Sequence, residues 1–446
     1  MCGRFARKEE GVFSVQKRKL YVLSIDAMIY EDTAFMETLP NLGPFVKRAS
    51  RVKRVKTVYP SLTYTCHASM ITGCYPDRHG IVHNEQFTPG DPLPIWYHYR
   101  TPYQALDTLP ELAHRSGYKV GSVFWPTTGG LDIDWNVAEI WDWSFQPEDM
   151  RRQLMESSTP AFIEEIWPTY GQILQGLSDP YFDWFCNHAL AYMIKEKKPD
   201  VFFQHLSAVD HARHNLGVFA EGLKRDAWIQ QDKEFGMIVR ALEESGELEN
   251  TTFCITSDHG QTPVDHLVCP NIKLVEEGLI RLNEDGSLKD WDVFVNSAAH
   301  SAHVYLKDPG DSDLRARMAA LLRRWQDEGE LGIETIFTAE EVKAHRLTGD
   351  FAFVLEGTDG YAYSNNLTGP LVFSADNSDY KYSVATHGHL PEKGPQPTFM
   401  LVGPGVKPGV ELECCDIVDE APTLAALLGL EMKGVDGKVL HQLLAD

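Results

Sequence analysis

Hydrophobic residues along the chain gather in short runs that end abruptly at polar side chains. Four such runs cover residues 20–25, 201–206, 253–256 and 398–402. Short apolar runs of this kind, each with a helical stretch nearby, are typical of a doubly wound, mostly parallel sheet. Ligands bind beyond the carboxyl ends of the strands in such sheets, so the polar residues that follow the runs are the first candidates for a functional site.

A longer periodic segment lies between the second and third runs. Residues 222–247 alternate charged and apolar positions at helical spacing, and Gly246 near the end is a helix stop signal. We therefore predict a long helix that covers one face of the sheet.

Residues 270–380 fit this alternation poorly, because turn signals such as Asp308-Pro309-Gly310 and Asp359-Gly360 are scattered through them. We predict an inserted smaller lobe at 270–380, a core made of residues 20–269 and 381–446, and an N-terminal extension at 1–19. The apolar run at 351–355 fits either the lobe or the main sheet.

The composition limits the class of protein. A chain of 446 residues with 43% hydrophobic residues is long enough for a large buried core. Its formal net charge of -23 opposes binding to a long nucleic acid, which needs clustered lysine and arginine. A small anion can still bind if metal ions supply local positive charge.

The N-terminal region is basic and is followed by an apolar run of six residues that Asp26 ends. This pattern lacks a secretory cleavage site, and no apolar run approaches the roughly 18 residues of a membrane span. The eight cysteines are scattered without metal-ribbon or disulfide spacing. We expect a cytoplasmic protein with reduced thiols and no membrane partner.

Four polar clusters follow strands or occupy glycine-containing turns. They are Asp26, Asp210-His211-Ala212-Arg213-His214, Ser257-Asp258-His259-Gly260 and Thr386-His387-Gly388-His389. Any one of them alone is an ordinary solvated loop, but several at strand ends indicate a common site. Carboxylate and imidazole together suit zinc or a similar divalent ion.

The spacing within these clusters is informative. Asp210 and His214 are four residues apart, so a helical turn directs both to one ion, whereas adjacent Asp258 and His259 require a sharp turn. The ligand candidates are numerous enough for two metals. Two metals about 4 Å apart stabilise both the entering and the leaving oxygen of a phosphoryl displacement.

A nucleophile is available in residues 59–67, where several hydroxyl side chains precede a helical stretch at 68–71. Metal coordination activates a hydroxyl, and a helix N-terminus favours a phosphate anion. The alternative interpretation is a helix cap, which is the usual role of Ser and Thr before a helix.

Taken together, these residues resemble the nucleotide pyrophosphatase/phosphodiesterases (type I phosphodiesterases) of the alkaline phosphatase superfamily. The resemblance covers about residues 20–430 except the lobe. It is carried by Ile25-Asp26, Leu39-Pro40-Asn41-Leu42, Tyr59-Pro60 with Thr63 and His67, residues 72–81 with Asn84, Pro94-Ile95-Trp96, Phe124-Trp125-Pro126, Asp210 with His214, Ser257-Asp258-His259-Gly260, His387-Gly388 and Gly403-Pro404-Gly405.

The resemblance implies an alkaline-phosphatase-type fold and a mechanism. Thr63 would be the nucleophile, forming a phosphothreonine intermediate that water hydrolyses, and Asn84 would donate to a phosphoryl oxygen. Two divalent metals, with zinc favoured, would be bound by Asp210, His214 and His387 and by Asp26, Asp258, His259 and Thr63. The substrate would be a small phosphodiester or nucleotide.

Two motifs narrow the branch of the superfamily. Cys66-His67-Ala68-Ser69-Met70 lacks the C/S-x-P-x-R pattern of sulfatases. Trp96, Phe124 and Trp125 lie in segments that resemble the diesterase branch, where aromatic residues stack on a nucleobase. Core packing is the alternative role for these three aromatics.

The chain departs from the family after the nucleophile, where Tyr64-Thr65-Cys66-His67 replaces the usual Phe-Pro-Asn-His. This change affects the local loop and therefore the choice of substrate. The alternatives on the same two-metal core are a phosphomonoesterase, a phosphonate hydrolase, and a phosphotransferase or mutase. A binding module without activity would require decayed ligand positions, and none has decayed.

Overall fold

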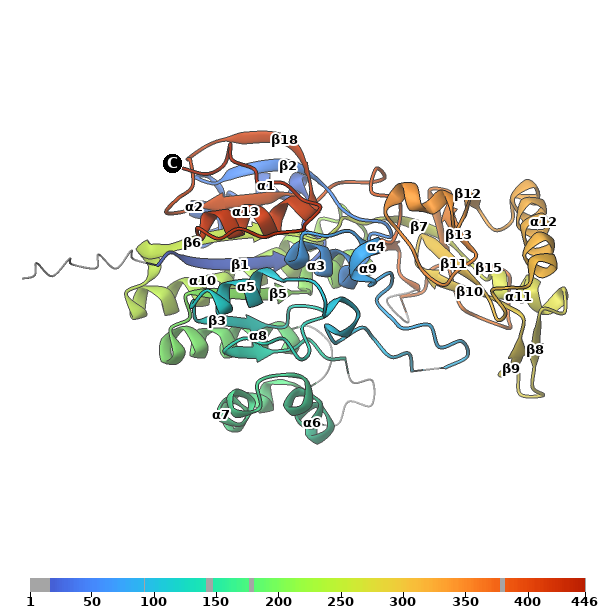
Figure 1. Cartoon of the computed structure of the whole chain (residues 1–446), viewed down its shortest axis with the longest axis horizontal. Coiled ribbons are helices and arrows are strands. Elements are labelled where there is room, and N and C mark those ends of the chain that lie inside the picture. Colours follow the sequence, from blue (N-terminus) through green and yellow to red (C-terminus); the bar gives the residue numbers. More distant parts are fainter. Residues whose placement is uncertain (1–16, 92, 142–146, 176–179, 378–381, 446) are drawn as a thin grey trace, which may run out of the picture.

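The computed structural model describes residues 17–91, 93–141, 147–175, 180–377 and 382–445. An eight-stranded sheet forms the core of the larger part of the molecule (Figure 1). Its neighbours are parallel except for β17, which runs antiparallel to both β6 and β2. In spatial order the strands are β18 (Glu411–Asp416), β2 (Ser50–Lys56), β17 (Phe399–Val402), β6 (Thr251–Thr256), β1 (Lys19–Ile25), β5 (Val201–Leu206), β3 (Val120–Val123) and β4 (Trp135–Val137).

Helices cover both faces of this sheet, and the side chains of β1 explain why. Tyr21, Leu23 and Ile25 belong to one hydrophobic cluster, whereas Leu20 and Val22 belong to the other. The first cluster includes residues of α1 (Thr33–Met36), α2 (Gly43–Val46), α6 (Pro147–Ser157), α7 (Pro160–Tyr170), α8 (Tyr181–Tyr192) and α10 (Ile229–Ser245). The second includes residues of α3 (Thr63–Thr72), α5 (Leu109–Arg115) and α13 (Glu420–Leu427).

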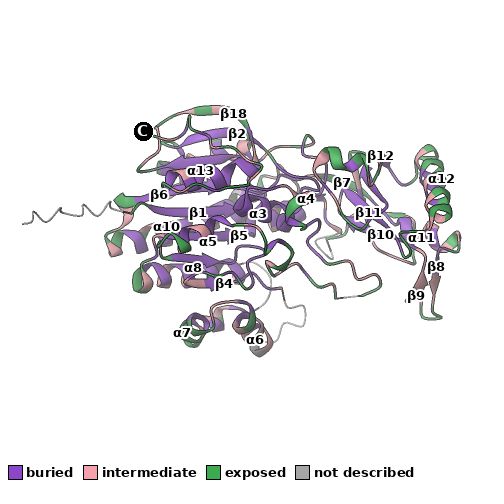
Figure 2. Cartoon of the chain, in the orientation of Figure 1, coloured by how far each residue is buried: buried purple, intermediate pink, exposed green. Residues whose placement is uncertain are grey.

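Figure 2 shows the central strands as buried, as expected for a sheet covered on both faces. The four predicted apolar runs correspond to β1, β5, β6 and β17. The predicted long helix is α10, which follows a π-helical turn at Lys224–Trp228 and ends at Gly246 with a φ of 74°. The prediction of a doubly wound, mostly parallel sheet is confirmed.

A second, smaller sheet lies beside the core (Figure 1). Its strands are all antiparallel, in the order β10 (Val293–Ala298), β11 (Ser301–Leu306), β13 (Phe353–Gly357) and β12 (Ile333–Thr338). The apolar run at 351–355 therefore contributes to this sheet and not to the main one. Around it lie α11 (Pro270–Glu276), α12 (Ser312–Glu328) and the pair β8 (Ile280–Leu282) and β9 (Leu288–Trp291).

Strand β7 (Thr262–Val268) connects the core to this region. It pairs with β14 (Gly360–Tyr363), β15 (Val372–Phe373) and β16 (Ala385–Thr386), so it belongs to a third small sheet. The boundary at residue 270 stays a prediction. Residue 381 and most of the predicted N-terminal extension, 1–16, lie outside the described residues.

Two further features bear on the sequence predictions. Within the described ranges, no helix is both long and apolar enough to cross a membrane. The seven cysteines among the described residues form no disulfide bond, and Cys2 lies outside the described residues.

Candidate active site

The predicted ligands converge where adjacent parallel strands end. Asp26 directly follows β1, and Asp258 and His259 follow β6 in the bend predicted for them. Asp210 and His214 lie on α9 (Ala208–Leu216), which begins just after β5. Because β6, β1 and β5 are neighbours, their carboxyl ends bring these side chains together. His387 reaches the same place from the end of β16.

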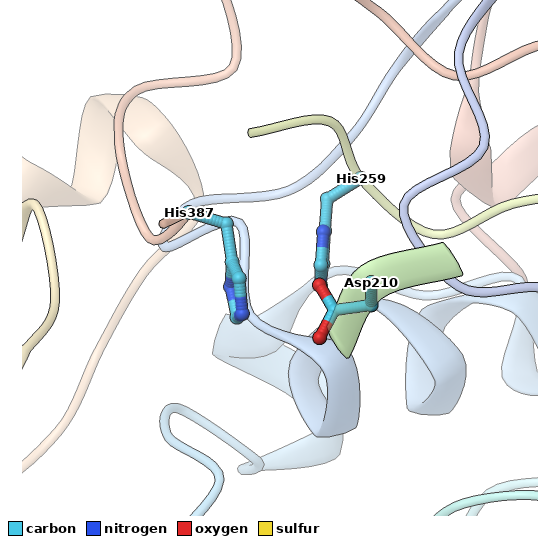
Figure 3. Close-up of side chains that lie close together, drawn as sticks. All are labelled: Asp210, His259 and His387. Atoms are coloured by element: carbon cyan, nitrogen blue, oxygen red, sulfur yellow. The ribbon is translucent and has the colours of Figure 1, made fainter. Parts of the chain in front are cut away.

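Two groups of buried side chains have the geometry of metal sites. Asp210, His259 and His387 place one ligand atom each within 4.8 Å of one another (Figure 3). Asp26, Asp258 and His259 form a second such group. His259 therefore lies between the two, with its ring stacked at 3.9 Å on that of His387.

The remaining predicted ligand, His214, lies beside the first group. Its Nε2 atom is 3.2 Å from Asp210 Oδ2, as the four-residue spacing on a helix predicted. The division of the ligands between two ions stays a prediction, because His259 is close to both groups.

Backbone carbonyls orient two of the imidazole rings. His214 Nδ1 donates to the carbonyl oxygen of Ala385 at 2.7 Å, and His387 Nδ1 donates to that of Ser61 at 2.9 Å. Each bond fixes the tautomer and leaves Nε2 as the ligand atom.

The electrostatics of the site are those of candidate metal ligands. Burial and the nearby Asp210 raise the pKa of Asp26 to about 6, and burial and Asp26 raise the pKa of Asp258 well above its usual value. Asp26 Oδ1 and Asp258 Oδ2 are buried and have no hydrogen-bond partner among the described residues. Burial also lowers the pKa of His387 to about 4, which keeps its ring neutral for coordination. This donor set fits divalent metal ions.

Thr63 is the first residue of α3, and its Oγ1 is 3.2 Å from Nε2 of His259. The helix starts earlier than the stretch 68–71 that the sequence indicated. The N-cap residue is Leu62, so Thr63 does not act as the cap. The hydroxyl therefore points to the ligand cluster from a helix N-terminus.

Asn84 lies beside the nucleophile candidate. Its Oδ1 accepts a hydrogen bond from the Tyr64 backbone N–H at 3.0 Å. This bond fixes the amide and leaves the Nδ2 group as a donor. Thr63 and Asn84 both line a cavity of about 200 Å³, together with Asp26, Asp210, His214 and His387.

The three predicted substrate-binding aromatics have different surroundings. Trp96 lines the cavity, next to Tyr64. Phe124 packs against Phe182 in the core, and Trp125 is buried against His67. For Phe124 and Trp125 the structure shows core packing, the alternative role that the sequence left open.

Sequence reasoning missed four residues of the cavity wall, His205, Ser207, Glu139 and Trp141. His205 donates to Asp26 Oδ2 at 3.1 Å and to Glu139 Oε2 at 2.7 Å, and Trp141 Nε1 donates to Glu139 Oε1 at 3.0 Å. Burial alone would lower the pKa of His205, but Glu139 and Asp26 raise it well above its usual value. The His205 ring therefore connects a candidate metal ligand to a buried carboxylate.

The departure from the family motif lies next to the nucleophile candidate. Tyr64, Thr65 and Cys66 are all fully buried, and Tyr64 also forms part of the cavity wall. His67 Nδ1 donates to the carbonyl oxygen of Thr63 at 2.8 Å, and its Nε2 lies 2.9 Å from Ser24 Oγ. The retained histidine thus holds the first turn of α3 in place.

Comparisons with known proteins place this site in a family context. Rat ectonucleotide pyrophosphatase/phosphodiesterase family member 7 is 22% identical over 435 residues, which cover 95% of this chain and 86% of the relative. The Xenopus laevis bis(5′-adenosyl)-triphosphatase is 25% identical over 266 residues, or 58% of this chain and 49% of that protein.

The solved structures that match include murine ectonucleotide pyrophosphatase/phosphodiesterase 5. Its TM-score is 0.66 at 17% identity, and the match covers 96% of this chain and all of the murine chain. An inactive variant of the murine protein in complex with AMP matches with the same TM-score. At this identity the similarity establishes the fold, which is of the predicted alkaline phosphatase type.

The model of the type I phosphodiesterase / nucleotide pyrophosphatase family matches residues 20–388. That match spans most of the chain, and the predicted resemblance is confirmed. The protein therefore belongs to the type I phosphodiesterase / nucleotide pyrophosphatase family, whose members are metal-dependent enzymes that hydrolyse phosphodiester or pyrophosphate bonds.

Proposed function

We propose that this protein hydrolyses phosphodiester or pyrophosphate bonds of nucleotides or related small molecules through a covalent intermediate on Thr63. Two divalent ions, with zinc favoured, would be held by Asp210, His214 and His387 and by Asp26, Asp258 and His259. Bound there, the ions would supply Lewis-acid stabilisation of the deprotonated hydroxyl and of the phosphoryl oxygens.

The position of Thr63 carries the proposal. Its Oγ1 lies 3.2 Å from His259, the residue common to both ligand groups, at the N-terminus of α3. The Thr63 oxygen forms a bond to phosphorus while the bond to the leaving oxygen breaks. Water then breaks the threonine–phosphorus bond and releases the second product.

Asn84 and the aromatic wall bind the rest of the substrate. Asn84 Oδ1 is occupied by the Tyr64 N–H, so Nδ2 donates to a nonbridging phosphoryl oxygen. Trp96 and Trp141 line the same cavity and offer ring surfaces to a base. A nucleotide substrate is supported by the murine relative, whose inactive variant was solved with AMP, and by the relative named bis(5′-adenosyl)-triphosphatase.

The test is to trap the intermediate. The purified protein, loaded with zinc, is mixed with a radiolabelled dinucleotide, quenched rapidly in acid and digested. Label on the peptide that contains Thr63 is expected. Label on Ser61 or Thr65, or none under conditions of turnover, contradicts the proposal.

A phosphomonoesterase remains the nearest alternative function. A monoester carries a second negative charge, and no lysine or arginine is among the described residues that line the cavity. We therefore expect at least about tenfold higher kcat/KM for a diester than for a monoester of the same chromophore, or about 1.4 kcal/mol. A preference for the monoester favours the alternative.

A phosphotransferase would pass the phosphoryl group to an alcohol instead of water. Product analysis with an added acceptor alcohol separates the two reactions. Hydrolysis predicts that the free phosphoryl product dominates at every acceptor concentration tested.

A further inference from the structure

A second cavity lies where a segment of the core meets the smaller sheet. It has a volume of about 290 Å³ and is bordered on the core side by residues 85–86, 88–91 and Pro94, and on the other side by β10, residues 364–367 and Tyr382. The predicted catalytic residues do not line it. Its chemistry therefore needs a separate explanation.

The wall of this cavity is rich in uncharged hydrogen-bonding groups. Asparagine amides, hydroxyl groups and two carboxylates surround it, with Phe294 as an aromatic surface. None of the described wall residues is lysine or arginine. The wall is therefore unsuited to a phosphate or another anion, and it resembles the surroundings of a ligand with several hydroxyl groups, which both donate and accept.

The amides of the wall are held in place by one another. Asn365 Nδ2 donates to Asn296 Oδ1 at 3.1 Å, and Asn365 Oδ1 accepts from the Ser297 N–H at 2.7 Å. The Tyr382 hydroxyl donates to Asn366 Oδ1 at 3.0 Å. The acceptor oxygens of these amides are thus occupied, which leaves amide N–H groups as donors.

Two polar groups of the wall are available to a ligand. Thr88 Oγ1 is buried and has no hydrogen-bond partner in the described part of the chain. Buried polar groups are normally bonded, so this hydroxyl indicates a missing ligand or solvent. Asn296 lines the same cavity with its Oδ1 bonded to Asn365, so its Nδ2 group is the donor that it offers to a ligand.

The second cavity adjoins the active site. A gap of about 20 Å³ lies between them; it shares Asn84 and His387 with the active-site cavity and Ser297 with the second cavity. The core segment also borders both, with Asn84 and Trp96 at the first and Glu85 and Pro94 at the second. A group bound in the second cavity therefore lies next to the reacting centre.

We infer that the second cavity binds an uncharged polyhydroxyl group, such as a hexose, from Asn296, Asn366 and Thr88. The hexose is either a free sugar or part of the diester substrate. A hexose that is part of the substrate rests on the proposed function, whereas the binding of a free sugar does not.

The first experiment measures binding directly on the full, zinc-loaded protein. Saturation-transfer NMR with methyl β-glucopyranoside should give a signal with the unaltered protein, and glucose 6-phosphate should give a much weaker one. Asn296→Asp keeps the acceptor for Asn365 but removes both N–H donors, and Thr88→Val removes the hydroxyl at nearly constant volume. Each should reduce the signal at least about threefold, whereas Asn283→Asp, in an exposed turn, should not.

The second experiment separates the two sources of the sugar. If the hexose is part of the substrate, Asn296→Asp should lower kcat/KM for uridine diphosphate glucose about tenfold and leave that for bis(4-nitrophenyl) phosphate within twofold. If the sugar is free, Asn296→Asp should leave kcat/KM unchanged for both substrates, while the NMR signal of methyl β-glucopyranoside falls.

The inference is overturned if methyl β-glucopyranoside gives no signal and the two substrates respond equally to Asn296→Asp. It is also overturned if the signal survives both Asn296→Asp and Thr88→Val. Absence of turnover of bis(4-nitrophenyl) phosphate by the unaltered protein contradicts the proposed function instead, and the NMR measurement still decides the sugar site.

Discussion

Charged side chains meet in two contrasting settings in this molecule. On the β8–β9 pair, Arg281 binds Asp290 and Asp292 at 2.6 Å, and all three side chains are about 40% exposed. At the active site, Asp26 and Asp258 are almost completely buried and meet imidazoles, with no lysine or arginine in the described cavity wall. An arginine balances the first pair of carboxylates, whereas the second pair has only histidines as cationic neighbours.

The pKa values express this difference. Hydrogen bonds from Lys307 and Arg281 lower the pKa of Asp290 below its usual value. Burial raises the pKa of Asp26 to about 6. A buried carboxylate whose charge is unfavourable is a candidate metal ligand, because a bound cation would stabilise its ionised form.

Replacing Thr63 with alanine should have the largest effect on activity. Thr63→Ala removes the attacking oxygen, so kcat should fall by roughly 10³-fold or more. The fold and the metal content should stay nearly unchanged, because the Asp and His ligands remain. Steady-state kinetics and elemental analysis of the same preparation measure both quantities.

Thr65 provides the matched control for this variant. Its hydroxyl lies two residues away in the same helix, is buried and has no partner among the described residues. Thr65→Ala should keep most of the activity. An inactive Thr65→Ala together with an active Thr63→Ala would show that Thr65, and not Thr63, is the nucleophile.

Removing the metals should have the next largest effect. Chelation should abolish turnover, and Asp258→Asn should lower metal content and reduce kcat/KM by roughly 10²-fold at fixed zinc. Elemental analysis after dialysis should find close to two ions per unaltered chain. A metal content near zero with activity insensitive to chelators would refute the two-metal interpretation.

Metal stabilisation should also depend on pH in a defined direction. The folded metal-free protein holds a proton on Asp26 up to about pH 6, above the ordinary carboxyl value of 3.8. The stability of the metal-free protein therefore falls as pH rises from about 4 to about 6. Over the same range Asp26 loses the proton that competes with the metal for its carboxylate. The difference in Tm between zinc-loaded and metal-free protein should grow from pH 4 to pH 6.

Glu139 should have an intermediate effect. Glu139→Gln weakens the bond to His205 and so loosens the orientation of Asp26, for which we expect about a tenfold loss of kcat/KM and weaker zinc affinity. Glu111→Gln is the control, because Glu111 is also buried and pairs with Arg100 at 2.9 Å but does not line the cavity. Equal losses in both variants would indicate a general effect on folding.

The smallest effect is expected in the exposed set of charges. Arg281→Ala removes two ion pairs that water already screens, so Tm should shift by only about 2 °C or less and kcat/KM should not change. A large loss of stability would show that the contrast between the two settings is false.

The strand ends were predictable because each is marked in the sequence. Apolar residues of β1, β5 and β6 stop at polar residues, and the sheet order then brings Asp26, Asp210 and Asp258 together. His205 was not predictable in this way, because it lies inside the apolar run of β5. Only the pairing of β1 with β5, in which Ser24 is opposite His205, places it next to Asp26.

The aromatic residues show a second limit. Trp96, Phe124 and Trp125 occur in similar apolar and proline-containing segments, but only the tertiary structure separates a cavity wall from the core. Glu139 and Trp141 follow the short strand β4, and nothing near them in the sequence marks a site. Their role comes from contacts with distant residues, such as that of Glu139 with His205 and that of Trp141 with Trp96.

The position of β17 has a consequence for synthesis of the protein. This strand inserts between β2 and β6, so the sheet is incomplete until residue 402 has left the ribosome. His387 is also among the last parts to emerge, although Asp26 and Thr63 are among the first. Nascent chains, and chains terminated before residue 387, therefore lack a finished reaction centre. Until β17 is made, the edges of β2 and β6 that it covers stay unpaired and open to aggregation.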